Sequence, residues 1–122
     1  MQRAMGLARA AAEAGEAPIG AVLVDPATGE VVAEAHNQPI GLNDPTAHAE
    51  VLVEPRAMCA GAISHARIGR VVYGADDAKG GAVAHGPRFF EQPTCHSRPQ
   101  VSSGVMAGEA SSLLKEFFRA RR

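Results

Sequence analysis

The spacing of hydrophobic and polar positions predicts helices mixed with short strands in the first third of the chain. Apolar residues recur at helical spacing over 2–15, which predicts a helix that Gly15 can end. The apolar run PIGAVLV predicts a buried strand over 18–24, and EVVAEAH predicts a second strand over 30–36. The sequence DPATG between them is typical of a turn, so the two strands are expected to form a hairpin.

The rest of the chain is less regular. A cap formed by DPT predicts a short helix over 46–52, although Pro55 follows closely. Beyond that point the pattern predicts two helices at 57–65 and 107–121, two strands at 67–74 and 100–106, and a long loop at 75–99. The alternation of the two kinds of element indicates an α/β fold.

Composition limits the class of protein. With 122 residues, the chain is expected to form one domain over 1–122, and its hydrophobic content of 46% with only 4% aromatic residues predicts an aliphatic core. No apolar run approaches the length of a membrane span, so we expect a cytoplasmic protein with no membrane partner. Cys59 and Cys95 could form a disulfide, but a reducing compartment favours two thiols.

The net charge of −1 conceals an asymmetry between the two halves of the chain. Residues 1–55 carry two basic and eight acidic residues, whereas residues 56–122 carry ten basic and five acidic ones. The C-terminal half could therefore face a polyanion, although an ordinary solvated basic surface fits the same numbers.

The chemistry of the chain is concentrated in the stretch THAE and in the segment EPRAMC that follows it. A neutral imidazole from His48 can bind a metal while the carboxylate of Glu50 moves protons on the attacking water. The pattern H-x-E followed by P-C-x-x-C is the signature of zinc deaminases. Here Pro55 and Cys59 fit the second half, but Arg56 stands where the first Cys belongs.

Over most of its length the chain resembles bacterial tRNA-specific adenosine deaminases, which convert the wobble adenosine of a tRNA anticodon to inosine. The resemblance is carried by PIGAVLV, HNQPIGLNDPTAHAE, MCAGAISHARIGRVVYGADDAKGGAV, RFFEQPTCH and LLKEFFRARR. It implies a three-layer α-β-α fold of the cytidine-deaminase type with a mixed five-stranded sheet. It also implies a homodimer, one Zn²⁺ per subunit and a tRNA anticodon stem-loop as partner.

The resemblance assigns a role to individual residues. His48 and Cys59 would be metal ligands, and Glu50 would carry a proton from the attacking water to N1 of the adenine. Asn37 would hydrogen-bond the flipped base. The residues expected to contact the anticodon loop are Asp77, Lys79, His96, Phe118 and Arg122.

The chain departs from the family in two places. The family carries roughly two dozen more residues between the THAE helix and the EPC motif, including the central strand, and here only Val51, Leu52 and Val53 remain. We therefore expect a truncated central strand and a spatial break or a locally repaired fold around 52–54. The guanidinium of Arg56 stays charged and cannot replace a thiolate ligand, and no spacing supports Cys95 or His96 as a substitute.

Three functions remain open on the sequence. The first is a zinc-dependent tRNA adenosine deaminase, which the basic C-terminal helix and the long 75–99 loop favour. The second is a deaminase of free bases or nucleosides. The third is a degenerate RNA-binding or dimer-partner subunit that lost its metal through Arg56.

Overall fold

The computed structural model describes residues 1–44, 48–49 and 54–122. In chain order the elements are α1 (Gln2–Glu13), β1 (Gly20–Val24), β2 (Val31–His36), α2 (Ala57–His65), β3 (Arg70–Val72), the 3₁₀ helix η1 (Phe89–Glu91), β4 (Gln100–Ser102) and α3 (Ala107–Arg119). Helices combined with antiparallel and parallel strand pairs confirm the expected α/β class.

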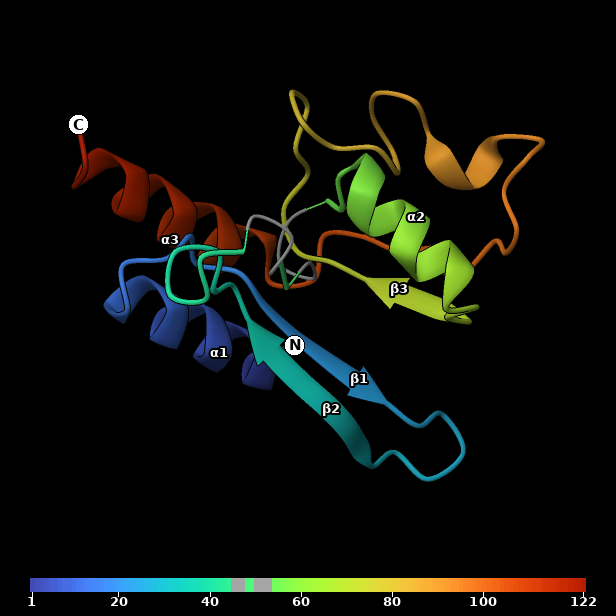
Figure 1. The fold of residues 1–122 in the computed structure, drawn as a ribbon, viewed down its shortest axis with the longest axis horizontal. Coiled ribbons are helices and arrows are strands. Elements are labelled where there is room, and N and C mark those ends of the chain that lie inside the picture. Colours follow the sequence, from blue (N-terminus) through green and yellow to red (C-terminus); the bar gives the residue numbers. More distant parts are fainter. Residues whose placement is uncertain (45–47, 50–53) are drawn as a thin grey trace.

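One half of the molecule consists of the β1–β2 hairpin with α1 and α3 (Figure 1). The strands pair antiparallel from Gly20 opposite His36, which confirms the predicted hairpin. Ala4, Met5 and Ala8 of α1 form a buried cluster with Ala110 of α3. A side chain at Gly20 would collide with the carbonyl oxygen of Ala4, so the tight packing of α1 on β1 requires a glycine there.

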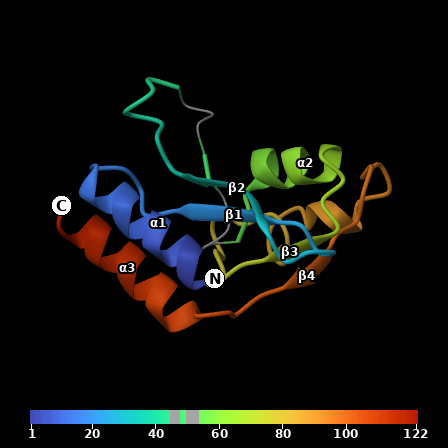
Figure 2. The ribbon, with the colours of Figure 1, turned by 90° about the horizontal axis from the view of Figure 1, so that it is seen from below.

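The other half consists of α2, β3, β4 and η1, and Figure 2 shows it beside the α1–α3 pair. β3 and β4 pair in parallel, and α2 covers them through a second buried cluster. Its buried members are Ala60, Val71, Tyr73, Val83 and Phe90. Phe90 belongs to η1, so its burial in this cluster anchors the middle of the long loop at 75–99.

Apart from the helix expected over 46–52, the predicted helices and strands exist, but most are shorter than expected. The strand expected over 67–74 covers Arg70–Val72, because Arg67 adopts a left-handed backbone with φ of 54°. The strand expected over 100–106 covers Gln100–Ser102, because Gly104 and Met106 are also left-handed, with φ of 80° and 57°. The helix expected over 2–15 ends at Glu13, and Gly15 follows with φ of 83°.

Three further bounds also move inward. The strand expected over 18–24 begins at Gly20, because the backbone N–H of Ile19 bonds locally to Ala17. The strand expected over 30–36 and the helix expected over 107–121 become Val31–His36 and Ala107–Arg119. The helix over 57–65 is confirmed with the predicted bounds.

In the described part of the chain the strands form two separate two-stranded sheets rather than one mixed sheet. Glu54 and Pro55 lie beside the second half, because the N–H of Glu54 donates to Ala75 and the N–H of Ala82 donates to Pro55. The helix expected over 46–52 falls mostly outside the described residues, and its described members His48 and Ala49 are not helical. Of the break expected at 52–54, Leu52 and Val53 lie outside the described residues, whereas Glu54 is described.

Candidate functional site

A cleft of about 420 Å³ collects side chains from both halves of the molecule. Its walls come from the segments that flank the hairpin, from the start of α2, from the loop after β3 and from α3. The lining residues that bear on chemistry are Asn37, His48, Glu54, Arg56, Asp76, Asp77, Lys115 and Phe118. Such a mixture of convergent polar groups and apolar wall is typical of a small-molecule or base-binding cleft.

Asn37 positions the His48 segment against the end of the hairpin. It is buried, and its Oδ1 accepts a hydrogen bond of 2.6 Å from the backbone N–H of Ala49. Its own N–H donates to the carbonyl of Ile19. With Oδ1 occupied in this way, Nδ2 is the atom of Asn37 that could donate to a ligand in the cleft.

Arg56 occupies the N-terminal end of α2, at the edge of the same cleft. A cation is unfavourable there, because the exposed N–H groups already give that end of a helix a partial positive charge. The carboxylate of Asp77 offsets this, at 3.9 Å from the Arg56 guanidinium. The side chain of Arg56 is 65% exposed, so the ion pair is a weak, solvent-screened one.

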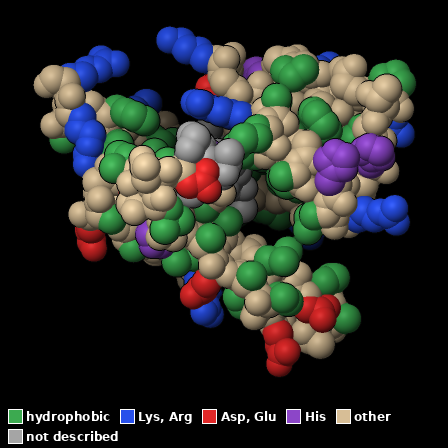
Figure 3. Space-filling view, viewed as in Figure 1, with side chains coloured by type: hydrophobic (Ala, Val, Ile, Leu, Met, Phe, Trp, Pro, Cys, Tyr) green, Lys and Arg blue, Asp and Glu red, His purple; other side chains and the backbone are tan. Residues whose placement is uncertain are grey.

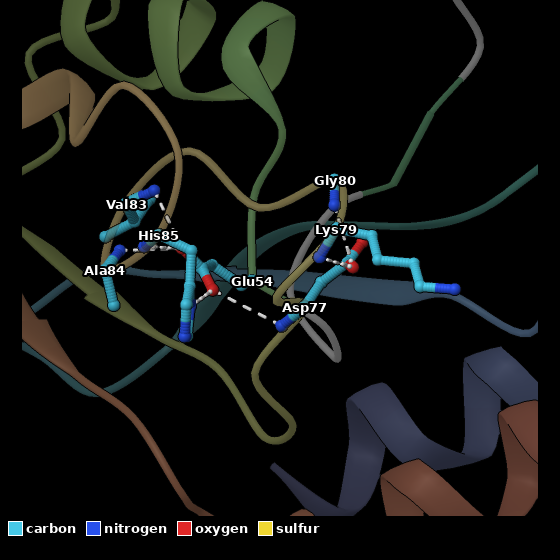
Figure 4. A network of polar contacts seen from close by, with 7 residues as sticks. All are labelled: Glu54, Asp77, Lys79, Gly80, Val83, Ala84 and His85. Atoms are coloured by element: carbon cyan, nitrogen blue, oxygen red, sulfur yellow. Dashed lines mark hydrogen bonds and ion pairs between the residues drawn. The ribbon is translucent and has the colours of Figure 1, made fainter.

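Glu54 is the centre of the polar network drawn in Figure 4. The side chain is fully buried, and its Oε1 accepts backbone hydrogen bonds from Val83, Ala84 and His85 at 2.7–3.0 Å. Its Oε2 meets Nδ1 of His85 at 2.5 Å and the N–H of Asp77 at 3.3 Å. We call these residues the Glu54 network.

The network sets the protonation of both ionisable partners. Burial alone would raise the pKa of Glu54, but the hydrogen bonds from His85, Val83 and Asp77 outweigh it and hold that pKa below its ordinary value. The hydrogen bond to Glu54 is also the main cause that raises the pKa of His85 above its ordinary value. The favoured state is therefore a Glu54 carboxylate facing a His85 imidazolium.

The sequence-predicted site residues divide into two groups. Asn37, His48, Asp77 and Phe118 line the cleft together. The other predicted residues in the described part are not among its lining residues: Cys59, Lys79, His96 and Arg122. Glu50 lies outside the described residues.

The second group is spread over the molecule. Cys59 is buried on α2, and both Cys59 and Cys95 are thiols rather than a disulfide. The backbone of Lys79 donates to Asp77, while its side chain points away from the Glu54 network (Figure 4). His96 is exposed and stacks near His65, with ring centroids 4.6 Å apart.

The sequence pattern assigns no role to Glu54, His85 or Lys115. The signal for Glu54 is a single carboxylate directly after the apolar run VLV, because a buried carboxylate must find donors. Nothing in the spacing indicates that His85, more than thirty positions away, is one of them.

Charge is distributed unevenly over the face shown in Figure 3. Acidic side chains lie along the hairpin, and several basic side chains lie over the C-terminal helix. On that helix Phe118 is 52% exposed at the cleft, and the guanidinium of Arg121 lies 3.6 Å from the ring centroid of Phe117. Exposed aromatic and basic groups of this kind are suited to single-stranded RNA.

Among the described residues, no helix combines the length and the apolar character that crossing a bilayer requires.

The comparisons with known proteins agree on one family. Residues 1–53 match the model of the cytidine and deoxycytidylate deaminase zinc-binding region. The whole chain is 46% identical to the tRNA-specific adenosine deaminase of Agrobacterium fabrum and covers 93% of it. That alignment runs over 144 positions, more than the 122 residues of this chain, as expected if a segment is missing here.

Solved structures support the same conclusion. A structure from studies of A-to-I editing by tRNA:A34 deaminases at the wobble position matches with a TM-score of 0.87 and 44% identity, over 93% of this chain and 97% of that one. A guanine deaminase from Nitrosomonas europaea matches with a TM-score of 0.78 at 17% identity, over 95% of this chain and 81% of that one. The second likeness concerns the fold alone.

The family region that the chain matches is a zinc-binding region, which confirms Zn²⁺ as the expected cofactor at the level of the family. The donors at the family positions do not complete a zinc site in the described part of the chain. Arg56 cannot ligate, and Cys59 is not among the residues that line the cleft with His48. His48 and Cys59 are the two donors that remain at the family positions, whereas a catalytic zinc normally has three protein ligands. The ligand residues stay a prediction, and we derive no reaction step through zinc.

Proposed function

Because this chain belongs to the tRNA-specific adenosine deaminases, we propose that it converts the wobble adenosine of a tRNA anticodon loop to inosine. The reaction is a zinc-dependent hydrolytic deamination in this family, in which water replaces the amino group at C6 and ammonia leaves. The observation that carries the proposal is the match along the whole chain to deaminases of this substrate class.

The cleft provides groups that suit an extruded base. Nδ2 of Asn37 would donate to the base edge, and Phe118 would stack on an unpaired base of the loop. Lys115 on the same wall would attract phosphate. Asp77, Lys79, His96 and Arg122 remain proposed contacts to more distant parts of the anticodon loop.

Glu50 remains the proposed proton carrier, which would accept a proton from the attacking water and deliver it to N1 of the adenine. We also propose a cytoplasmic homodimer. Val32 of β2 is 64% exposed and Met58 of α2 is 52% exposed, so these apolar side chains are available to a dimer interface.

A second candidate is an RNA-binding or dimer-partner subunit without deaminase activity. One observation favours it: the guanidinium of Arg56 stands at a ligand position and pairs with Asp77 inside the cleft. A cation at that position opposes a metal ion as well as failing to bind it.

The two candidates can be separated with an anticodon stem-loop that carries a wobble adenosine. Nuclease digestion and mass spectrometry would measure inosine, and fluorescence anisotropy would measure binding. We expect inosine in the wild-type reaction and none with Glu50→Ala, with binding retained in both. Binding without inosine would replace the first candidate by the second.

A free-base control tests the remaining alternative. Adenine, guanine and adenosine would be offered at the same concentration as the stem-loop. Faster conversion of a free base than of the stem-loop would show that the fold likeness to a guanine deaminase extends to substrate, and would reject the tRNA assignment.

A further inference from the structure

A buried glutamate follows the C-terminal end of α1. Glu16 is 4% exposed, and its backbone N–H donates to the carbonyl oxygen of Ala11 at 2.9 Å. Gly15 before it has a left-handed backbone with φ of 83°, so the two residues form the hydrogen-bonded end of the helix. Because α1 is packed on α3 through a buried cluster, the backbone that carries the Glu16 side chain is firmly placed.

The side chain of Glu16 reaches the segment that follows β2. Its Oε1 accepts hydrogen bonds from the backbone N–H of Ile40 at 2.9 Å and from that of Gly41 at 2.7 Å. We call residues 38–44 the post-hairpin turn. A single oxygen that accepts two adjacent N–H groups fixes the position of this turn and also its orientation.

The apolar side chains of the post-hairpin turn do not hold it against a core. Ile40 is 75% exposed and Leu42 is 61% exposed, and Figure 2 shows the turn extending away from the helices and strands. Hydrogen bonds inside the turn, such as the one from the N–H of Leu42 to the carbonyl of Gln38, give it its shape. They do not attach it to the body of the molecule, whereas the two bonds to Glu16 tie it to the end of α1.

The post-hairpin turn lies between two residues that line the cleft, Asn37 and His48. The N–H of Asn37 is bonded to Ile19, and its Oδ1 accepts the N–H of Ala49, so the segment closes on itself at Asn37. Glu16 holds the middle of the closed segment. A displaced turn would draw the N–H of Ala49 away from Asn37, whose amide would then lose the bond that leaves Nδ2 for a ligand.

We propose that Glu16 is a positioning residue for base recognition, which keeps Asn37 and Ala49 together by holding the post-hairpin turn. Glu16 is not among the residues that line the cleft, so it acts through Asn37 and not by touching the base. A donor that is already oriented loses less freedom when the base binds. The identity of the ligand rests on the proposed function, but the coupling of Glu16 to Asn37 can be measured without RNA.

Three substitutions at position 16 separate the reach of the side chain from its charge. Glu16→Ala removes the acceptor, and Glu16→Asp keeps a carboxyl group that is one methylene too short to serve both N–H groups. Glu16→Gln keeps the length, and its amide oxygen can accept both hydrogen bonds. Glu13→Ala is the matched control, because Glu13 is an exposed glutamate in the last turn of the same helix.

Hydrogen exchange followed by NMR tests the coupling in the free protein. The amides of Ile40 and Gly41 should exchange at least about tenfold faster in Glu16→Ala and in Glu16→Asp, because they lose their acceptor. The amide of Ala49 donates to Asn37 and not to Glu16, and it should also exchange faster. Glu16→Gln should restore the wild-type rates. Faster exchange at Ile40 and Gly41 with an unchanged rate at Ala49 would overturn the proposal, since Glu16 would then anchor only its own turn.

Binding of two anticodon stem-loops tests the role in recognition. One carries a wobble adenosine and the other an abasic wobble nucleotide, and fluorescence anisotropy measures both. The wild type should prefer the first, and this preference should fall by about threefold to tenfold in Glu16→Ala and Glu16→Asp, which is the effect of one hydrogen bond. Glu16→Gln and Glu13→Ala should keep it. A purely structural loss would weaken both complexes equally and leave the preference unchanged, which would contradict the proposal.

A double-mutant cycle with Asn37→Ala tests whether the two residues act through one contact. Asn37→Ala alone should lower the preference for the wobble base, and adding Glu16→Ala should change it little further. Additive effects would show that Glu16 acts elsewhere and would reject the proposal. Failure of the proposed function has a different signature: the wild type would then bind both stem-loops equally, while the amide of Ala49 would still respond to Glu16→Ala.

Discussion

Glu54 and Arg56 are two residues apart in the sequence, and both line the cleft, but they illustrate opposite situations. Glu54 is fully buried and accepts five hydrogen bonds from segments around residues 77 and 83–85. Arg56 is largely exposed, and within the described residues it makes one long ion pair, with Asp77. The fold depends on the first residue and hardly on the second.

This difference explains how a chain can keep a family's fold with an altered metal-ligand set. Removing a buried, multiply bonded carboxylate leaves several N–H groups without partners, so such a change is costly. The side chain of Arg56 is 65% exposed, so an Arg at this position keeps its charge and its hydrogen-bond donors in contact with water. Folding therefore constrains Glu54 directly, whereas only the chemistry constrains the position of Arg56.

The largest expected effect follows from removing the Glu54 carboxylate. Glu54→Ala should lower the free energy of unfolding by about 3–5 kcal/mol, because five donors lose their acceptor and His85 keeps a charge without a partner. Denaturant titration of the metal-free chain measures this. The matched control is Glu91→Ala, which removes only an exposed pair with Arg88 and should cost about 0–1 kcal/mol. Similar costs for the two variants would contradict the comparison.

A somewhat smaller effect is expected from replacing Gly81, whose lack of a side chain leaves room for the Glu54 carboxylate. A Cβ at Gly81 would overlap the Glu54 carboxylate and lie 2.5 Å from the carbonyl oxygen of Asp77. Gly81→Ala should therefore destabilise the chain by about 1–3 kcal/mol through overpacking. Gly108→Ala on α3 meets nothing within 4 Å and should stabilise the helix by about 0.5–1 kcal/mol. Thermal melts of the two variants should shift in opposite directions.

The same contrast shows which parts of the structure could be predicted from the sequence. The helices α1, α2 and α3 follow from local periodicity, because each buries part of one face. The hairpin follows from two apolar runs that flank the turn sequence DPATG. The strand ends at Arg67 and Gly104 were missed, since a left-handed backbone at Arg67 has no sequence signal. Cleft residues such as Asn37 and His48 were found through the family motif rather than through periodicity.

The Glu54 network could not be predicted, because its contacts join positions about thirty residues apart. One carboxylate after VLV indicates a buried acceptor, but the loop that supplies the donors has no periodic pattern. No sequence feature distinguishes His85 from an ordinary surface histidine, so its hydrogen bond to Glu54 could not be predicted. Residues 45–47 and 50–53, which include Glu50, lie outside the described part, so their predicted helix and break stay predictions.

The smallest effect on folding is expected at Arg56. Arg56→Cys should change the free energy of unfolding by less than about 1 kcal/mol, because it removes an exposed pair at 3.9 Å and also a cation from the positive end of α2. By itself it should leave the rate of inosine formation within about twofold of the wild type, because three ligands act together only when they are held in a fixed geometry.

The segment that the relatives carry in addition is expected to supply that geometry. A chain with this helix–loop–strand segment reinserted and Cys at position 56 should therefore form inosine at least about a hundredfold faster than either the wild type or Arg56→Cys. Reinsertion that keeps Arg56 is the matched control and should improve stability but not the rate. A full gain from Arg56→Cys alone would show that the ligand, and not the missing segment, limits this chain.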